Sequence, residues 1–452
     1  MVAARPSETL SRTSFGILFS VSIVVAIGNT GMQSVLPAIG RKLHIADWMV
    51  AGIFSLSAIL WAVMSPIWAQ ESDARGRKPL ILLGLIGFII SMVLCGAVVS
   101  LGIHTAVAPV LIFVLFLVAR STFGLIGSAS NPATQAYVAE HTSREQRTEH
   151  MAGLASAFGL GTIVGPVLAP IFVLPVISLA GPMFGFSIIA AVMLAVVWRY
   201  LPESHAFAGG RDARPFARAG RRERDSMGDF LKNLARLLRD PRLVHFLVFG
   251  FLVASCQTAQ LQILGFMIID KLHISPEQAQ PYTATAMMAG AMAGLLAQLA
   301  FIRLFKMTPK TLMRWGVALA ALANLMTAFA PNFHTVVVGY ALGSLGYGFA
   351  RPGFTAGASL TMNSGEQAKA AGAIAMVNGL NVVLGPAFVL LYGFSHPAPF
   401  LLNTVVLGGL LIYAFANSVL RKAGENAPTD DEAPDTPQEQ ATLALLERSD
   451  EG

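Results

Sequence analysis

Charged residues gather in one short stretch of the sequence, ESDARGRKPL at residues 71–80, although only 12% of the chain is charged. Within it Asp73, Arg77 and Lys78 surround Gly76, which permits a tight bend of the backbone. Glu140 is a further carboxylate that Arg77 can bridge. These residue types form ion pairs that can break and re-form, so the chemistry they offer is a latch between helix ends. The alternative is an anchor that only fixes the topology of the chain.

Two arginines, Arg120 and Arg351, lie inside long apolar stretches. An arginine at mid-membrane depth costs about 2.5–3.5 kcal/mol, so both are expected to face a cavity or a protein partner. Arg351 lies nearer the end of its stretch and can instead extend toward the membrane surface. No Asp or Glu lies deep inside an apolar stretch, since Glu149 is at the polar start of its stretch, and arginine does not release a proton at physiological pH. A buried proton carrier is therefore not evident.

Uncharged polar residues within the apolar stretches outline a candidate substrate cavity. Amides three or four residues apart, such as Asn29 and Gln33, share one face of a helix. They can line a cavity or bond a neighbouring helix. A cavity of this kind suits a polar neutral or anionic organic solute better than a lipophilic cation, which would require a carboxylate. The candidate cavity residues are Asn29, Gln33, Gln257, Gln260, Tyr347, Arg351, Asn378 and Asn381.

The elements that hold these residues are long and apolar. Hydrophobic residues make up 54% of the 452 residues, and the mean hydropathy is +0.63, outside the range of soluble domains. Because lipid offers the backbone no hydrogen-bond partner, every stretch that crosses a bilayer must be a helix. The sequence therefore predicts an all-α polytopic membrane protein with twelve transmembrane helices. The predicted spans are 14–39, 48–70, 80–101, 109–138, 148–174, 180–200, 242–269, 283–305, 311–331, 334–361, 370–393 and 399–420.

The basic residues predict the orientation of the chain. With a cytoplasmic N-terminus, three Lys and Arg fall outside, two lie deep within spans, and the remaining 26 of the 31 lie in cytoplasmic segments or at the cytoplasmic ends of spans. This is the positive-inside pattern, so we expect both termini in the cytoplasm and the protein in the plasma (inner) membrane. The net charge of +6 then reflects topology, and no nucleic-acid partner is expected. The three residues outside are Arg41, Lys42 and Lys271.

The chain divides into two related halves. Residues 1–200 and 242–420 each hold six spans, joined by a cytoplasmic linker at 201–241 that contains an amphipathic helix. GLGTIVGP at 159–166 and GLNVVLGP at 379–386 are related by an offset of 220 residues, which indicates two pseudo-symmetric six-helix bundles around a central cavity. The tail, 421–452, is acidic and is predicted to be disordered.

Enzymatic chemistry is not indicated. No metal-ligand spacing, nucleophile motif or phosphate-binding loop is present, so neither a metal nor a cofactor is expected. The two cysteines, Cys95 and Cys256, fall within spans and are expected to be buried and inert. A membrane enzyme would need catalytic groups that converge at one membrane face, and none is found.

Four motifs resemble those of the major facilitator superfamily. DARGRKPL resembles its loop signature, with Ala74 where arginine is common, and Arg120 lies in the segment ARSTFG. GTIVGPVL, which contains Gly161, Gly165 and Pro166, resembles the antiporter signature, and LPESH closes the sixth span. The resemblance is closest to twelve-helix drug/proton antiporters of the tetracycline-efflux type.

The resemblance implies roles for these motifs. The loop at 71–78 would switch the protein between inward-open and outward-open states, and Arg120 would take part in coupling. Asp73 would meet the positive N-terminal end of span eleven, near Ala370, and so hold the two halves together. In span five, the small residues at spacing four, which include Gly161 and Gly165, would let another helix approach closely.

The predicted function is secondary active transport of a small organic solute by alternating access, with drug export as the leading direction. The alternative is an importer or facilitator of an organic anion without proton antiport, which the missing carboxylate favours. A sensor with the same fold that transports nothing is a further alternative. The expected partners are the solute, the lipid bilayer and, for an antiporter, protons, and the protein is expected to be a monomer.

Overall fold

The chain is helical throughout the part that the computed structural model describes. That part comprises residues 10–142, 144–175, 177–203, 240–362, 373–374, 377 and 379–423. Besides helices it contains one isolated bridge, between Leu174 and Ser178. The predicted all-α fold is therefore confirmed. Most of the linker, the tail and the start of span eleven, including Ala370 and Asn378, lie outside the described residues.

Helices of the first half match the first six predicted spans. They are α1 (Arg12–Lys42), α2 (Asp47–Arg75), α3 (Arg77–His104), α4 (Pro109–Leu125), η1 (Gly127–Ala129), α5 (Ser130–Glu140), α6 (Arg144–Leu168), η2 (Ala169–Phe172) and α7 (Gly181–Tyr200). The second half contains α10 (Val244–Leu272), α11 (Ala279–Leu296), η4 (Ala297–Phe301), α12 (Ile302–Leu304), α13 (Pro309–Ala328), α14 (Phe333–Leu360), η5 (Asn381–Leu384), α16 (Gly385–Phe394), α17 (Ala398–Ala416) and α18 (Ser418–Arg421).

Nine helical stretches of the described residues are long and apolar enough to cross a membrane. The other three predicted spans are also helical where the structure describes them. Helices α13 and α14, of 20 and 28 residues, are not among the nine, and span eleven is described as an apolar helix only over Asn381–Phe394. Nine of the twelve predicted spans are thus confirmed as membrane-crossing by length and composition, and the count of twelve stays a prediction.

Prolines mark the points at which long spans change from α-helix to tighter turns. Pro132 has no N–H for the carbonyl four residues earlier, and η1 occupies the preceding turn between α4 and α5. Pro170 lies in η2, where α6 ends after Leu168. The α-helix continues past Pro166, and the change to a 3-10 turn comes at Ala169, about one turn later.

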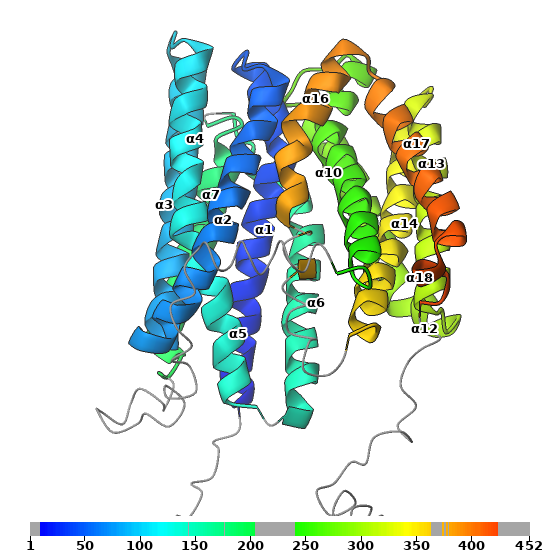
Figure 1. Cartoon of the computed structure of the whole chain (residues 1–452). Helices are drawn as coiled ribbons and strands as arrows, with labels where there is room; N and C mark the ends of the chain where they lie inside the picture. The colour runs from blue at the N-terminus through cyan, green and yellow to red at the C-terminus, as the bar shows by residue number, and fades with distance from the viewer. Residues whose placement is uncertain are drawn as a thin grey trace, which may run out of the picture.

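The two halves repeat the same packing pattern. In the first half, α3 packs on α4 and α7 and α1 packs on α6; in the second, α13 packs on α14 and α17 and α10 packs on α16. The halves meet where α2 contacts α16 and α6 contacts α11, which are also equivalent pairs. Figure 1 shows the two groups of helices side by side. This arrangement supports the predicted pseudo-symmetry.

A hydrogen bond is also repeated at equivalent positions. The Thr30 hydroxyl donates to the backbone oxygen of Gly161 at 3.2 Å, and the Thr258 hydroxyl donates to the Asn381 side chain. Gly161 and Asn381 are separated by 220 residues, the offset of the sequence repeat. The repeat in the sequence therefore corresponds to a repeat in the structure.

Helices α1 and α6 approach closely because glycines face α1. A Cβ atom placed on Gly165 would lie 2.4 Å from the Ile27 carbonyl oxygen, and one on Gly161 would lie 2.4 Å from the Ala26 Cβ. Neither position has room for a side chain. The small residues of span five thus admit a neighbouring helix as predicted, and that helix is α1.

The helix bundle has two ends, which we call the terminal face and the far face. The terminal face is the end at which α1 begins, α2 meets α3 at Gly76, and α18 ends; the far face is the opposite end, at which α1 ends with Lys42. Between them, the outer surface is apolar: Ile188 and Val192 on α7, and Val405 and Ile412 on α17, are 61–71% exposed. Such a belt of exposed aliphatic side chains is suited to lipid.

Candidate functional site: two arginine clusters and a cavity

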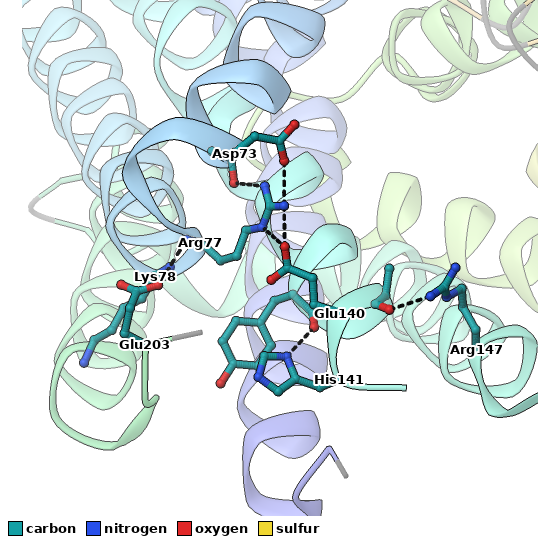
Figure 2. A network of polar contacts seen from close by, with 10 residues as sticks. Asp73, Arg77, Lys78, Glu140, His141, Arg147 and Glu203 are labelled. Carbon is teal, nitrogen blue, oxygen red and sulfur yellow. Dashed lines mark hydrogen bonds and ion pairs between the residues drawn. The ribbon is translucent and has the colours of Figure 1, made fainter. Parts of the chain in front are cut away.

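At the terminal face, Arg77 is the centre of a cluster of charged residues, which we call the Arg77 cluster: Asp73, Arg77, Glu140 and Glu203. Arg77 is 7% exposed, and its Nε donates to Glu140 Oε1 at 2.9 Å. The guanidinium also forms an ion pair with Asp73, one helical turn earlier in the chain (Figure 2). The structure thus contains the predicted bridge to Glu140, and Arg77 connects α2, α3 and α5.

Glu203, in the LPESH segment, caps the start of α3. Its Oε1 accepts from the backbone N–H groups of Arg77 at 3.1 Å and Lys78 at 3.2 Å. A carboxylate here satisfies two N–H groups that lack a partner within the helix and lies at the positive end of the helix dipole. Gly76 has a φ of 106°, a conformation that side chains rarely adopt, and an added Cβ would lie 3.1 Å from Glu203. The bend predicted at Gly76 therefore requires glycine.

Asp73, Arg77 and Glu140 belong to the first half, and Glu203 lies directly after it, at the start of the linker. The predicted contact of Asp73 with the N-terminal end of span eleven involves residues 363–372, which lie outside the described part of the chain. The predicted latch between halves at this face therefore remains a prediction. The side-chain oxygens of Asp73 are accessible, since that side chain is 67% exposed.

At the far face, a second arginine joins the two halves directly. We call Arg41, Asp47, Asp270 and Tyr392 the Arg41 cluster. Arg41 binds Asp47 through two hydrogen bonds, Nε to Oδ1 at 2.8 Å and Nη2 to Oδ2 at 2.7 Å. Its Nη2 also donates to Asp270 Oδ2, on α10 of the second half, at 3.0 Å. The Tyr392 hydroxyl donates to the same oxygen at 3.0 Å.

Lys42 and Glu277 form a further ion pair between the halves, with 2.9 Å from Nζ to Oε1. Burial raises the pKa of Glu277, but the hydrogen bond and charge of Lys42 outweigh this, and the pKa lies below its ordinary value of 4.5. Two ion pairs therefore join the halves at the far face. Sequence reasoning placed Asp47 and Asp270 at the outer ends of spans and gave them no role.

Arg120 is buried on α4, with 1% of its surface exposed. Its Nη2 donates to the side-chain oxygen of Asn29 on α1, and its guanidinium lies 5.1 Å from the ring centroid of Phe54 and 4.4 Å from that of Phe123. Nε and Nη1 have no hydrogen-bond partner among the described residues. As predicted for an arginine at this depth, Arg120 faces protein, and two predicted site residues, Arg120 and Asn29, lie together.

A similar pair occurs in the second half. Arg351 on α14 donates from Nη1 to the Gln257 side-chain oxygen on α10 at 3.3 Å. Gln260, one turn further along α10, is buried and donates to the Tyr340 backbone oxygen at 3.4 Å. Gln33 lines a small pocket where α1, α2 and α10 meet. These predicted cavity residues thus lie between helices.

The remaining predicted cavity residues take part in packing. Tyr347 is buried, and its hydroxyl accepts from Asn324 Nδ2 at 3.1 Å; Asn324 in turn accepts from Asn403 at 3.0 Å. Asn381 Nδ2 donates to the Val377 backbone oxygen at 3.2 Å. Amides at these positions join helices of the second half, which is the alternative that the sequence left open.

A cavity of about 470 Å³ lies elsewhere, in the terminal-face half of the first bundle. It is bounded by α1, α2, α5 and α6, and none of its lining residues carries a charge. Sequence reasoning did not select any of them. The residues are Val21, Ser22, Val25, Trp61, Ser130, Asn131, Thr134, Gln135, Met151, Leu154, Ala155 and Phe158.

Comparison with known proteins identifies the family. A family model described as Major Facilitator Superfamily matches residues 18–386, most of the chain. The chain belongs to this superfamily. Its members are transporters and not enzymes, so the chain is an integral membrane transporter for a small molecule.

Among curated members of the superfamily, the chain is 24% identical over 398 residues to Multidrug resistance protein 2 of Bacillus subtilis (strain 168), covering 88% of this chain and 93% of that protein. It is 31% identical over 160 residues to Tetracycline resistance protein, class B, of Escherichia coli, covering 34% of this chain and 36% of that protein. These relatives agree with the drug/proton antiporter branch predicted from the motifs.

Solved structures show the same fold. A bacterial homologue of the human lysosomal transporter Spinster, in an inward-facing and unoccupied conformation, has a TM-score of 0.68 and 14% identity, covering 95% of this chain and all of that chain. At this identity the likeness concerns the fold alone. It agrees with the superfamily assignment.

Proposed function

We propose that the protein exports a small organic solute across the plasma membrane by alternating access, and that the structure represents the inward-facing state. The observation that carries this proposal is the Arg41–Asp270 ion pair, which joins the halves at the far face. The cavity lies toward the opposite face, where Asn131 and Gln135 are exposed. A transporter closed at one face and accessible from the other must rearrange to release its solute.

The proposed orientation places the terminal face in the cytoplasm. The basic residues support it, because 26 of the 31 Lys and Arg fall on that side. In this orientation the cavity collects its solute from the cytoplasm, which suits export. Relatives named for multidrug and tetracycline resistance support the same direction.

Everted inner-membrane vesicles test this function. Vesicles that contain the protein are expected to accumulate tetracycline or chloramphenicol, an uncharged aromatic compound, when energised, whereas vesicles without it do not. Nigericin, which collapses the pH gradient, separates two outcomes: loss of accumulation supports proton antiport, and unchanged accumulation supports transport without it. Absence of transport for both probes, from protein shown to be inserted, would contradict drug export.

A matched pair of glycine variants links the flux to the turn at residue 76. Gly76→Ala forces a side chain into a φ of 106° beside Glu203 and is expected to reduce flux strongly. Gly408→Ala meets no atom within 4 Å and is expected to keep it. Equal expression of both variants is verified in the same membranes.

A further inference from the structure

The cavity between α1, α2, α5 and α6 has the size of a ligand site. Its volume of about 470 Å³ lies within the range of roughly 300–1,000 Å³ that is typical of small-molecule pockets. All four helices belong to the first half, so the cavity does not depend on a contact between the halves. It lies apart from the amides that the sequence proposed for the substrate.

The described residues that line this cavity are uncharged. Its polar groups are hydroxyls and amides, and its largest side chains are apolar or aromatic. The buried cation Arg120 lies against the ring of Phe123, and that ring packs against Trp61 of the cavity wall with centroids 5.1 Å apart. A charged ligand would therefore lose its hydration without gaining a counter-charge, which disfavours both cations and anions.

Thr134 supplies the observation that points to a ligand. It lines the cavity and is 2% exposed, and its Oγ1 has no hydrogen-bond partner among the described residues. Buried threonines elsewhere in the protein bond the carbonyl one turn earlier: Thr283 donates to Ala279 at 3.0 Å and Thr327 to Ala323 at 2.8 Å. A buried hydroxyl without a partner destabilises the protein unless something else bonds it.

The other polar groups of the wall already bond their own helix. Ser22 donates to the Leu18 backbone oxygen at 3.1 Å, and Ser130 to the Gly127 backbone oxygen at 3.1 Å. Gln135 Nε2 donates to Asn131 Oδ1 at 3.2 Å, and this bond engages one group of each amide. Thr134 is thus the hydroxyl of this wall to which a ligand would supply a hydrogen-bond partner.

Aromatic side chains flank the cavity on two helices. Trp61 extends from α2, and Phe158, which is 50% exposed, extends from α6. Rings on two of the lining helices favour a flat aromatic ligand, because stacked and edge-to-face contacts add to the area that is buried.

We propose that this cavity binds an uncharged aromatic compound whose polar group exchanges a hydrogen bond with the Thr134 hydroxyl. This inference rests on the proposed function, since it names the class of solute that is carried. It narrows the polar neutral or anionic solute expected from the sequence to a neutral one.

Three naphthalene probes of the same size test the charge preference: 2-naphthol, 2-naphthoate and a trimethylammonium naphthalene. Binding is measured on the purified full chain in lipid nanodiscs by quenching of tryptophan fluorescence and by the shift in thermal unfolding. 2-Naphthol is expected to bind at least about tenfold more tightly than either charged probe. Equal or tighter binding of a charged probe, or no binding of 2-naphthol, overturns the proposal.

Thr134→Val tests the hydrogen bond, because valine keeps the shape and removes the hydroxyl. The unliganded variant is expected to melt at a higher temperature than the wild type, while its affinity for 2-naphthol falls about three- to tenfold. Thr283→Val is the matched control: it loses a satisfied hydroxyl, so it melts lower and binds 2-naphthol normally. Wild-type affinity in Thr134→Val contradicts the assignment.

Failure of this inference is distinguishable from failure of the proposed function. Flux of tetracycline or chloramphenicol in everted vesicles without selective binding of 2-naphthol would retain the transporter and reject the ligand class. Selective binding of 2-naphthol without any flux would retain the site and reject drug export.

Discussion

Arg77 at the terminal face and Arg41 at the far face have the same number of carboxylate partners, but those partners lie in different parts of the molecule. Each guanidinium contacts two carboxylates. Both partners of Arg77, Asp73 and Glu140, belong to its own half, whereas Arg41 contacts Asp47 in its own half and Asp270 in the other. One cluster therefore stabilises a bundle, and the other joins two bundles. The Arg77 cluster contains the motif that stands out in the sequence. Among the described residues, however, it is the Arg41 cluster that connects the halves.

The largest effect is expected for Arg77→Gln, which removes the buried centre of the Arg77 cluster. Glu140, with 28% of its side chain exposed, would lose its cation, so the free energy of unfolding should fall by about 2–4 kcal/mol. Denaturant unfolding of the purified protein measures this. Arg75→Gln, whose side chain is 71% exposed in its pair with Glu71, is the control and should change by less than about 1 kcal/mol. Equal free energies of unfolding for the two variants would contradict the role of Arg77 in holding α2, α3 and α5 together.

A smaller effect, on conformation, is expected for Asp270→Asn. The substitution removes the cross-half ion pair while Arg41 keeps both hydrogen bonds to Asp47. The ratio of far-face-open to far-face-closed molecules should rise about fivefold, since a partly exposed ion pair contributes on the order of 1 kcal/mol. Spin labels at Thr105→Cys and His334→Cys, which are exposed on opposite halves, report the distance by electron paramagnetic resonance.

The same labels in Arg77→Gln provide the contrast. If Arg77 acts only within its own half at this stage of the cycle, the far-face distance distribution remains that of the wild type. A far-face opening in Arg77→Gln as large as that in Asp270→Asn would erase the difference between the two clusters.

The smallest effect is expected for the Lys42–Glu277 pair, and it depends on pH. Because the pKa of Glu277 is lowered by its partner when the far face is closed, the pair favours closure fully above about pH 4.5, its ordinary value. This contribution is lost as pH falls below that value through the lowered pKa. Glu277→Gln should raise the open fraction about twofold above pH 5 and by progressively less as the pH falls below about 4.5. A variant effect that grows on acidification would contradict this sign.

Much of the fold follows from the sequence because lipid restricts the backbone so strongly. Apolar length and the need for internal hydrogen bonds predict helices, and the conformation at residue 76 can be predicted because only glycine adopts it readily. The Arg77–Glu140 bridge could be predicted because both residues lie at the ends of spans that reach the same face. The packing of α1 on α6 follows from the small residues that include Gly161 and Gly165.

The site could be predicted less well, for physical reasons. A buried amide bonds a helix or a ligand equally well, so its residue type alone did not show that Tyr347 would pair with Asn324. Arg41 and Asp270 are 229 residues apart, and only the packing of the halves brings them to 3.0 Å. Thr134 gives no signal in the sequence, because its significance lies in the partner it lacks.

Helix α1 connects the two functional ends of the first half. It is 31 residues long, about 46 Å at 1.5 Å per residue, with Arg41 at one end and the cavity residues Val21 and Ser22 toward the other. At Gly161 and Gly165 of α6 only the small side chains of Ala26 and Thr30 lie between the two helices, and Thr30 also bonds the Gly161 backbone. We therefore expect α1 and α6 to move together, so that a displacement where the solute binds would also shift the end of α1 that carries Arg41.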